Sequence, residues 1–179
     1  MNVSLRLEEA EDYRTVEELT REAFWDIYRP GCVEHLIVYK LRNTPAFVRE
    51  LSYLACDDER IIGSIIYSRA KVVNDENEEF EVLCMGPLSV LPSWQGKGVG
   101  SLLMNYSIEK ARELGFKGIV IYGNPQYYRR FGFTNAEQYE IRTSSGENFD
   151  AFMALELFYG ALKGITGKYY EDKVFEISD

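Results

Sequence analysis

The sequence predicts a mixed α/β or α+β domain with a mainly antiparallel sheet and one parallel pair of strands late in the chain. Apolar residues make up 46% of the 179 residues, which is enough for a sizeable core. Short apolar runs alternate with helical patterns, and residues 80–122 read as a strand–helix–strand unit. Because no repeat, low-complexity stretch or long linker divides the chain, we expect a single domain over residues 1–179.

The first half of the chain contains two helical and two strand patterns. Near-helical spacing of Val16, Leu19 and Phe24 indicates the first helix. This helix must end before Pro30-Gly31, because proline breaks a helix. The polar turn at residues 57–60 separates two strand-like runs. The predicted elements are helices over residues 12–25 and 35–41 and strands over residues 53–56 and 61–73.

The second half begins with a long apolar strand, residues 80–91, in which Gly86-Pro87 should mark a bulge or a departure from the ladder. A helix is expected over residues 99–114, with Gly115 as its C-terminal stop. Its expected buried stripe consists of Val99, Leu102, Leu103, Tyr106 and Leu114. Further expected elements are strands over residues 118–122 and 152–157 and one helical turn over residues 127–131.

Charge and cysteine usage exclude several classes of protein. Lys and Arg number 20 against 29 Asp and Glu, a net charge of −9, which disfavours binding to nucleic acid. No apolar run reaches the ~18 residues of a membrane span, and the N-terminal residues lack the apolar core of a signal peptide. Cys32, Cys56 and Cys84 are far apart with no CxxC pair, and His35 is the only histidine. We therefore expect a cytoplasmic protein with reduced thiols and no metal site.

The most informative segment is the glycine-rich stretch Gln95-Gly96-Lys97-Gly98-Val99-Gly100, between a predicted strand and a predicted helix. Backbone amides of such a turn, at the positive end of a helix, form a concave set of donors that suits a phosphate or pyrophosphate. The spacing fits neither a P-loop, GxxxxGK(S/T), nor a dinucleotide fingerprint, GxGxxG. From the glycines alone, an ordinary glycine-rich turn is an equally good interpretation.

Neighbouring residues favour one family. Gln95-x-x-Gly98-x-Gly100 resembles the Q/R-x-x-G-x-G/A motif of the GCN5-related N-acetyltransferase (GNAT) superfamily. The later segment YYRRFGF, residues 127–133, is similar to its F-Y-x-x-x-G-F signature. The stretches MGPLSVLPSWQGKGVG, GNPQYYRRFGF and FMALELFYGALKGITGKYYE resemble the YhbS-type N-acetyltransferases, so that the resemblance covers residues 84–175.

The resemblance implies a GNAT-like mixed sheet in which two parallel central strands, here residues 80–91 and 118–122, splay apart around acetyl-CoA. Amides of Leu88 and Val90 would bond the thioester and pantetheine, and those of residues 96–101 the pyrophosphate. Tyr128 would protonate the departing CoA thiolate. The implied cofactor-binding residues are Leu88, Ser89, Val90, Gln95, Gly96, Lys97, Gly98, Val99, Gly100, Ser101, Tyr127 and Phe131.

Several roles stay open within this resemblance. Tyr128 could instead pack or bond the cofactor sulfur passively, and Lys97 could be a solvated lysine. We expect Cys84 to pack in the core rather than act as a nucleophile. Asn124 lies four residues before Tyr128, whereas many superfamily members have an asparagine about seven residues before the tyrosine. Glu81 is on the key strand, but the sequence does not assign it as a base.

The expected function is direct acetyl transfer from acetyl-CoA to a primary amine. The alternative is a non-catalytic acyl-CoA-binding or regulatory module that kept the cofactor cleft. The expected partner is a small-molecule or peptide amine, with no nucleic acid and no membrane. The oligomeric state is left open between a monomer and a homodimer.

Overall fold

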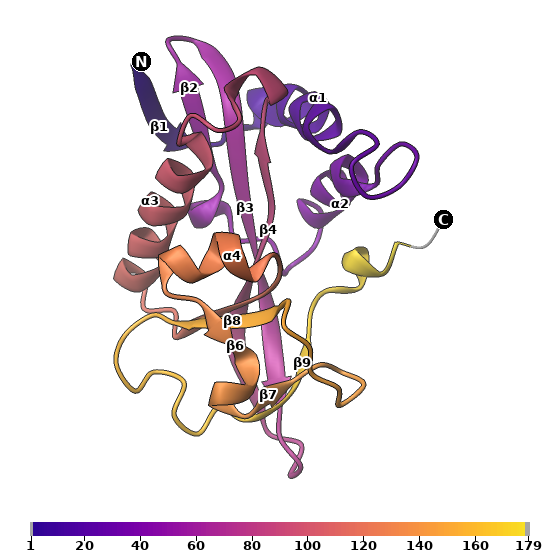
Figure 1. Ribbon diagram of the computed structural model, residues 1–179, viewed down its shortest axis with the longest axis vertical. Helices are drawn as coiled ribbons and strands as arrows, with labels where there is room; N and C mark the ends of the chain where they lie inside the picture. The colour runs from indigo at the N-terminus through magenta and orange to yellow at the C-terminus, as the bar shows by residue number, and fades with distance from the viewer. Residues whose placement is uncertain (1, 178–179) are drawn as a thin grey trace. The chain divides into compact units, whose positions relative to one another are not determined.

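The computed structural model describes residues 2–177 and divides into two compact units (Figure 1). The first unit comprises Met1–Tyr67, Gly86–Ser107 and Lys173–Asp179, and the second comprises Ser68–Met85 and Ile108–Asp172. Strands β3 (Arg60–Val73) and β4 (Glu79–Val90) run through both units.

The strands of the first unit are antiparallel. β1 (Val3–Leu7) pairs with β2 (Tyr53–Asp57), and β2 pairs with the first part of β3 across the polar turn that the sequence predicts. The β2–β3 register shifts between Ala55 and Cys56. β1 is an edge strand in which apolar and polar residues alternate, so that one face is partly buried and the other is exposed.

Three helices cover the strands of the first unit. Figure 1 shows α1 (Tyr13–Phe24) and α2 (Glu34–Leu41) on one side and α3 (Val99–Glu113) on the other. The Ser89 hydroxyl of β4 donates to Thr20 Oγ1 of α1 over 3.2 Å, and both residues are buried. On the α3 side, Gly63 lets the helix approach closely, because a Cβ there would lie 3.0 Å from Val99 Cγ1.

The buried stripe of α3 differs from the expected one. Val99 and Leu103 are buried as predicted, but Leu102, Tyr106 and Leu114 are exposed. The buried positions recur every four residues and are Val99, Leu103, Met104, Ser107, Ile108 and Ala111. The prediction centred the stripe on the wrong side of the helix, so that it left out the apolar residues Met104 and Ile108 and the small residues Ser107 and Ala111. The Ser107 hydroxyl is satisfied there by the Tyr67 hydroxyl at 2.9 Å.

A buried ion network that the sequence analysis did not foresee joins α1, α2 and the end of β1. The Arg42 guanidinium, with 4% of its side chain exposed, donates to both Glu8 and Glu17. Glu8 also accepts from the Ser52 hydroxyl at 2.9 Å. The Tyr13 ring centroid lies 4.1 Å from the guanidinium carbon. Such a network loses several kcal/mol when one partner is removed, because a buried charge is then left uncompensated.

The second unit holds the parallel pair. β5 (Gly118–Tyr122) runs parallel to β4 through Leu83↔Ile119 and Cys84↔Val120, and antiparallel to β8 (Phe152–Glu156). β8 also pairs with β6 (Thr134–Asn135), while β9 (Gly167–Tyr170) pairs with the end of β3 and, in parallel, with β7 (Ile141–Arg142). The predicted mixed, mainly antiparallel sheet flanked by helices is therefore confirmed.

Short elements complete the fold. α4 (Pro125–Tyr128) begins at the N-cap Asn124, whose side chain accepts from the Gln126 amide. The 3₁₀ turns are Ala10–Asp12, Arg49–Leu51, Pro92–Trp94, Arg129–Phe131, Ala136–Tyr139 and Lys173–Glu176. β4 continues as a strand through Gly86-Pro87, where the peptide bond is cis and Gly86 has φ of 137°. The structure describes no helix long and apolar enough to cross a membrane within residues 2–177.

Candidate functional site

The glycine-rich segment forms a tight connection from β4 into α3, inside the first unit. After β4 ends at Val90, the 3₁₀ turn Pro92–Trp94 reverses the chain, and α3 begins at Val99. Gly96 and Gly98 have φ of +73° and +86°, values that L side chains rarely adopt. A Cβ on either glycine would find no atom within 4 Å. These two glycines are therefore required by backbone conformation and face open space.

The amides of this segment are available to a ligand. The first hydrogen bond into α3 runs from the Leu102 amide to the Gly98 carbonyl at 3.0 Å. Within residues 2–177, the amides of residues 96–101 make no hydrogen bond to the carbonyl of another loop or turn. Helix N-termini leave such donors unsatisfied and carry a partial positive charge. The geometry can therefore bind an anionic group such as a phosphate.

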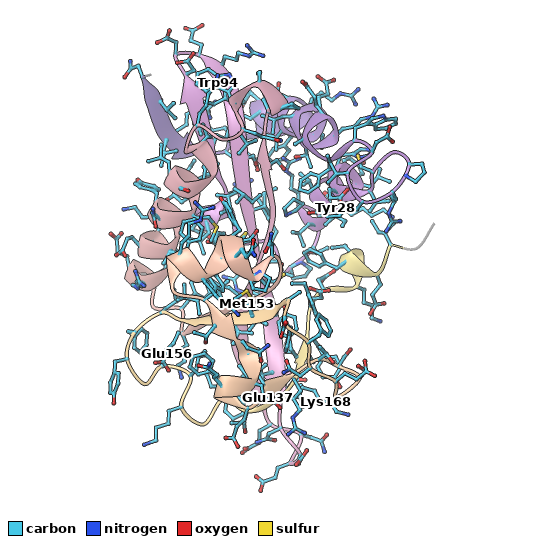
Figure 2. All side chains as sticks on the ribbon, viewed as in Figure 1. Tyr28, Trp94, Glu137, Met153, Glu156 and Lys168 are labelled. Carbon is cyan, nitrogen blue, oxygen red and sulfur yellow. The ribbon has the colours of Figure 1, made fainter. Side chains whose placement is uncertain are left out.

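Two side chains shape the loop from its exposed side. Gln95 donates from Nε2 to the Val90 carbonyl over 3.0 Å, which ties the loop to the end of β4. Lys97 lies with its ammonium nitrogen 5.2 Å from the Trp94 ring centroid, a cation–π distance. Figure 2 labels Trp94 on this turn. Lys97 is thus an exposed lysine whose charge lies beside an aromatic face at the loop.

The last residues of β4 offer main-chain groups rather than polar side chains to a ligand. Leu88 and Val90 are half-buried, whereas Ser89 is 1% exposed and bonded to Thr20. The Ser89 side chain is therefore turned into the core, and only its main chain is available for a ligand. Gly100 and Ser101 lie in the first turn of α3 and are half-buried.

The second predicted motif forms an aromatic cluster inside the second unit. Tyr128 ends α4, and its ring lies on the backbone of Gly123, where a Cβ would overlap the ring. It makes edge contacts with Tyr127 at 4.9 Å and Phe133 at 5.8 Å between ring centroids. Tyr127 in turn contacts Phe131 at 5.4 Å. Phe133 is buried, and Phe131 is half-buried.

Three further residues from the sequence analysis have defined surroundings. Asn124 caps α4 through its side chain, which gives it a structural role. Glu81 is exposed and pairs with Arg69 at 3.5 Å, beside a cavity of about 400 Å³ that Phe116 also lines. Cys84 is 4% exposed, and burial, followed by the charge of Glu171, raises the pKa of its thiol to about 12. A thiol with that pKa is protonated at neutral pH and is a poor nucleophile.

Comparison with known proteins identifies the family. The profile of the acetyltransferase (GNAT) family matches residues 13–133, more than half of the chain. The chain belongs to this family. It is 29% identical over 170 residues to the uncharacterized N-acetyltransferase YhbS of Escherichia coli strain K12, covering 93% of this chain and 96% of that protein.

Solved structures of GNAT family proteins resemble the fold closely. The crystal structure of Escherichia coli YhbS in complex with CoA matches with a TM-score of 0.88 and 26% identity, over 100% of this chain and 94% of that one. A GNAT family acetyltransferase from Brucella melitensis in complex with acetyl-CoA matches with a TM-score of 0.79 and 26% identity, over 97% of this chain and 98% of that one. The GNAT fold and the acetyltransferase class predicted from the two motifs are thereby confirmed.

The structure groups the predicted site residues into two sets. Residues 88–90 and 95–101 are contiguous with the start of α3 in the first unit, and residues 127–131 form the aromatic cluster of the second unit. Sequence reasoning missed the contact of Lys97 with Trp94 and the polar residue Glu171 beside Cys84. The first had a local signal, a lysine three residues after a tryptophan. The second had none, because 87 residues separate the two positions.

Proposed function

We propose that this acetyltransferase moves an acetyl group from acetyl-CoA directly to a primary amine. The observation that carries the proposal is the glycine-rich turn before α3, where Gly96 and Gly98 expose a set of backbone donors. Family membership and the two similar structures that hold CoA and acetyl-CoA support the same donor. A chain with a net charge of −9 is also suited to a cationic acceptor.

The residues around this turn fit the donor. The amides of residues 96–101 would bind the pyrophosphate, and Lys97 would add a positive charge from its position on Trp94. The main chain of Leu88, Ser89 and Val90 would bond the pantetheine arm and the thioester. Gln95 would act indirectly, by fixing the loop to Val90. Tyr127 and Phe131 remain the proposed apolar wall of the donor site.

In the proposed reaction, the neutral amine nitrogen forms a bond to the thioester carbon as the carbon–sulfur bond breaks. The amine loses a proton to solvent or to a base, and the CoA thiolate takes one from the Tyr128 hydroxyl. Support for Tyr128 comes from its place in the family motif and from its fixed ring against Gly123. The protonated, buried Cys84 supports transfer without an acyl-cysteine intermediate.

We further propose that both compact units belong to one acetyltransferase domain over residues 1–179, and that the protein resides in the cytoplasm. Alignment of YhbS along 93% of this chain supports the first statement. The three cysteines are all free, which supports a reducing compartment.

Release of CoA thiol from acetyl-CoA in the presence of a panel of primary amines tests this function. We expect release that depends on both the enzyme and an amine, together with mass-spectrometric detection of the acetylated amine. Calorimetric titration of CoA provides a separate measure of donor binding. Tight CoA binding without transfer to any amine would identify a non-catalytic acyl-CoA-binding module instead.

A further inference from the structure

One face of the sheet in the second unit gathers polar and aromatic side chains that the donor site does not use. In the β3–β9 register Val72 is opposite Tyr169, and Ser68 lies on the same face of β3 as Val72 because strand side chains alternate. In the β4–β5 register Cys84 is beside Val120, and Tyr122 follows on the same face. Four strands therefore direct Ser68, Cys84, Tyr122 and Tyr169 to one side.

A carboxylate joins these groups. Glu171 follows β9, and its Oε2 lies 3.6 Å from the Cys84 sulfur. The Ser68 and Tyr169 hydroxyls are close enough to the same thiol to influence its pKa. The carboxylate, the thiol and the two hydroxyls thus converge on one place within the second unit.

Two of the converging groups, the hydroxyls of Ser68 and Tyr169, are buried without a strong hydrogen bond. Ser68 and Tyr169 are 0% and 1% exposed, and among residues 2–177 their hydroxyls have no oxygen or nitrogen partner and meet only the Cys84 thiol, a weak hydrogen-bonding group. An unsatisfied buried hydroxyl costs about 1–3 kcal/mol and calls for a physical reason. A ligand that brings polar atoms to this place would supply one.

Aromatic rings extend from the carboxylate to the surface. Tyr122 packs on Phe152, its cross-strand partner, with 5.1 Å between ring centroids, and Phe152 lies 5.8 Å from Tyr169. Phe149 stacks on the outer side of Tyr122 at 5.8 Å. Tyr122 and Phe149 are each 45% exposed. The cluster therefore begins at the half-buried carboxylate of Glu171 and ends in rings that solvent reaches.

The negative charge of Glu171 raises the pKa of other titratable groups in this cluster. Burial first, and then the charge of Glu171, raises the pKa of the Tyr122 hydroxyl to about 12. The same two causes raise the pKa of Cys84 to about 12. With these neighbours kept neutral, the carboxylate supplies the negative charge of the cluster, and a cation brought there would be stabilised by it and by the aromatic faces.

We propose that Glu171 binds the ammonium group of the acceptor and that the Tyr122 and Phe149 rings contact the apolar body to which this group is attached. The inference rests on the proposed amine acetylation and specifies its acceptor as a monoamine on an apolar body. Glu171 acts here as a binding residue, and the amine must release its proton before it attacks the thioester.

Direct binding of 2-phenylethylamine, followed by calorimetry or tyrosine fluorescence without any donor present, tests the inference. We expect saturable binding to the wild type and at least tenfold weaker binding to Glu171→Gln, which keeps size and hydrogen bonding but removes the charge. The neutral analogue 2-phenylethanol should also bind at least tenfold more weakly than the amine. Phe149→Ala should weaken amine binding several-fold with little effect on folding, since its ring is half exposed.

Glu81→Gln is the matched control. Glu81 lies on β4 three positions from Cys84, hence on the opposite face, and pairs with Arg69. Its replacement removes the same charge from the same unit and should leave amine binding unchanged. Equal amine affinity in Glu171→Gln and the wild type, equal loss in Glu81→Gln, or no binding to the wild type at millimolar amine would each overturn the inference. Failure of the proposed function is seen separately, as absent acetyl transfer from acetyl-CoA to any amine of the panel.

Discussion

Replacement of Gly98 by aspartate tests whether the loop before α3 binds the pyrophosphate of acetyl-CoA. Gly98 has φ of +86°, so any L residue there adopts a left-handed conformation that costs roughly 1–2 kcal/mol. The built Cβ meets no atom within 4 Å, so no steric clash adds to this cost. A carboxylate in the first turn of a helix gains about 0.3–1 kcal/mol from the dipole. The variant should therefore fold, with a Tm lower by no more than a few degrees.

The effect on donor affinity should be much larger than the effect on stability. An aspartate carboxylate and a phosphate oxygen about 5 Å apart repel by roughly 1–3 kcal/mol for an effective dielectric constant between that of water and that of a protein surface. The pyrophosphate carries two such charges, and about 1.4 kcal/mol corresponds to a tenfold change in Kd, so we expect acetyl-CoA to bind at least tenfold more weakly.

Gly115→Asp is the control for this experiment. Gly115 follows α3 with φ of +83° and also has no atom within 4 Å of a built Cβ, so it reproduces the strain and the charge at the other end of the helix. Titration calorimetry of the three proteins with acetyl-CoA should show a loss only for Gly98→Asp. Wild-type affinity in a folded Gly98→Asp protein, or an equal loss in Gly115→Asp, would refute the pyrophosphate assignment.

Three further predictions follow from the structure. Tyr128→Phe should keep the fold and bind acetyl-CoA within a few-fold of the wild type, yet lower turnover by roughly tenfold or more, since general acids supply ~10²–10⁴-fold; unchanged turnover would leave the acid unassigned. At pH 8, a thiol reagent should modify at most the partly exposed Cys32 in the folded protein and all three cysteines after denaturation, because burial and the Glu171 charge keep Cys84 protonated; rapid labelling of Cys84 in the native state would contradict this. Glu8→Gln should lower the free energy of unfolding by about 3 kcal/mol in urea titrations, because it removes a buried partner of Arg42; a loss below ~0.5 kcal/mol would show that the network contributes little.

Local patterns predicted most of the elements. Pro30-Gly31, Pro92 and Gly115 lie where the structure separates helices and strands, and the ends of α1, α2 and α3 differ from the prediction by at most one residue. The glycine-rich loop could be predicted because its closely spaced glycines indicate a backbone with positive φ, which other residues rarely adopt. The face of α3 was partly misjudged, because apolar residues lie on both sides of this helix: Met104 and Ile108 are buried, whereas Leu102 and Tyr106 are exposed.

Features that depend on distant pairing could not be read from the sequence. β9 was missed because its four residues, GKYY, gain strand partners only from β3 and β7, far away in the chain. The Glu8–Arg42 pair joins positions 34 residues apart, and Glu171 approaches Cys84 across 87 residues. Charged side chains of this kind have no periodicity, so that only the assembled sheet reveals which of the 29 acidic residues has a particular role.

Mass spectrometry of one reaction mixture tests the central claim most directly. The protein is incubated with acetyl-CoA and the panel of primary amines, 2-phenylethylamine among them, and the masses of the small molecules and of the intact protein are measured over the time course. Direct transfer predicts acetylated amine and free CoA in equal amounts, with the mass of the protein unchanged throughout. An acetylated protein that forms before the product, or no acetylated amine despite bound acetyl-CoA, would contradict it.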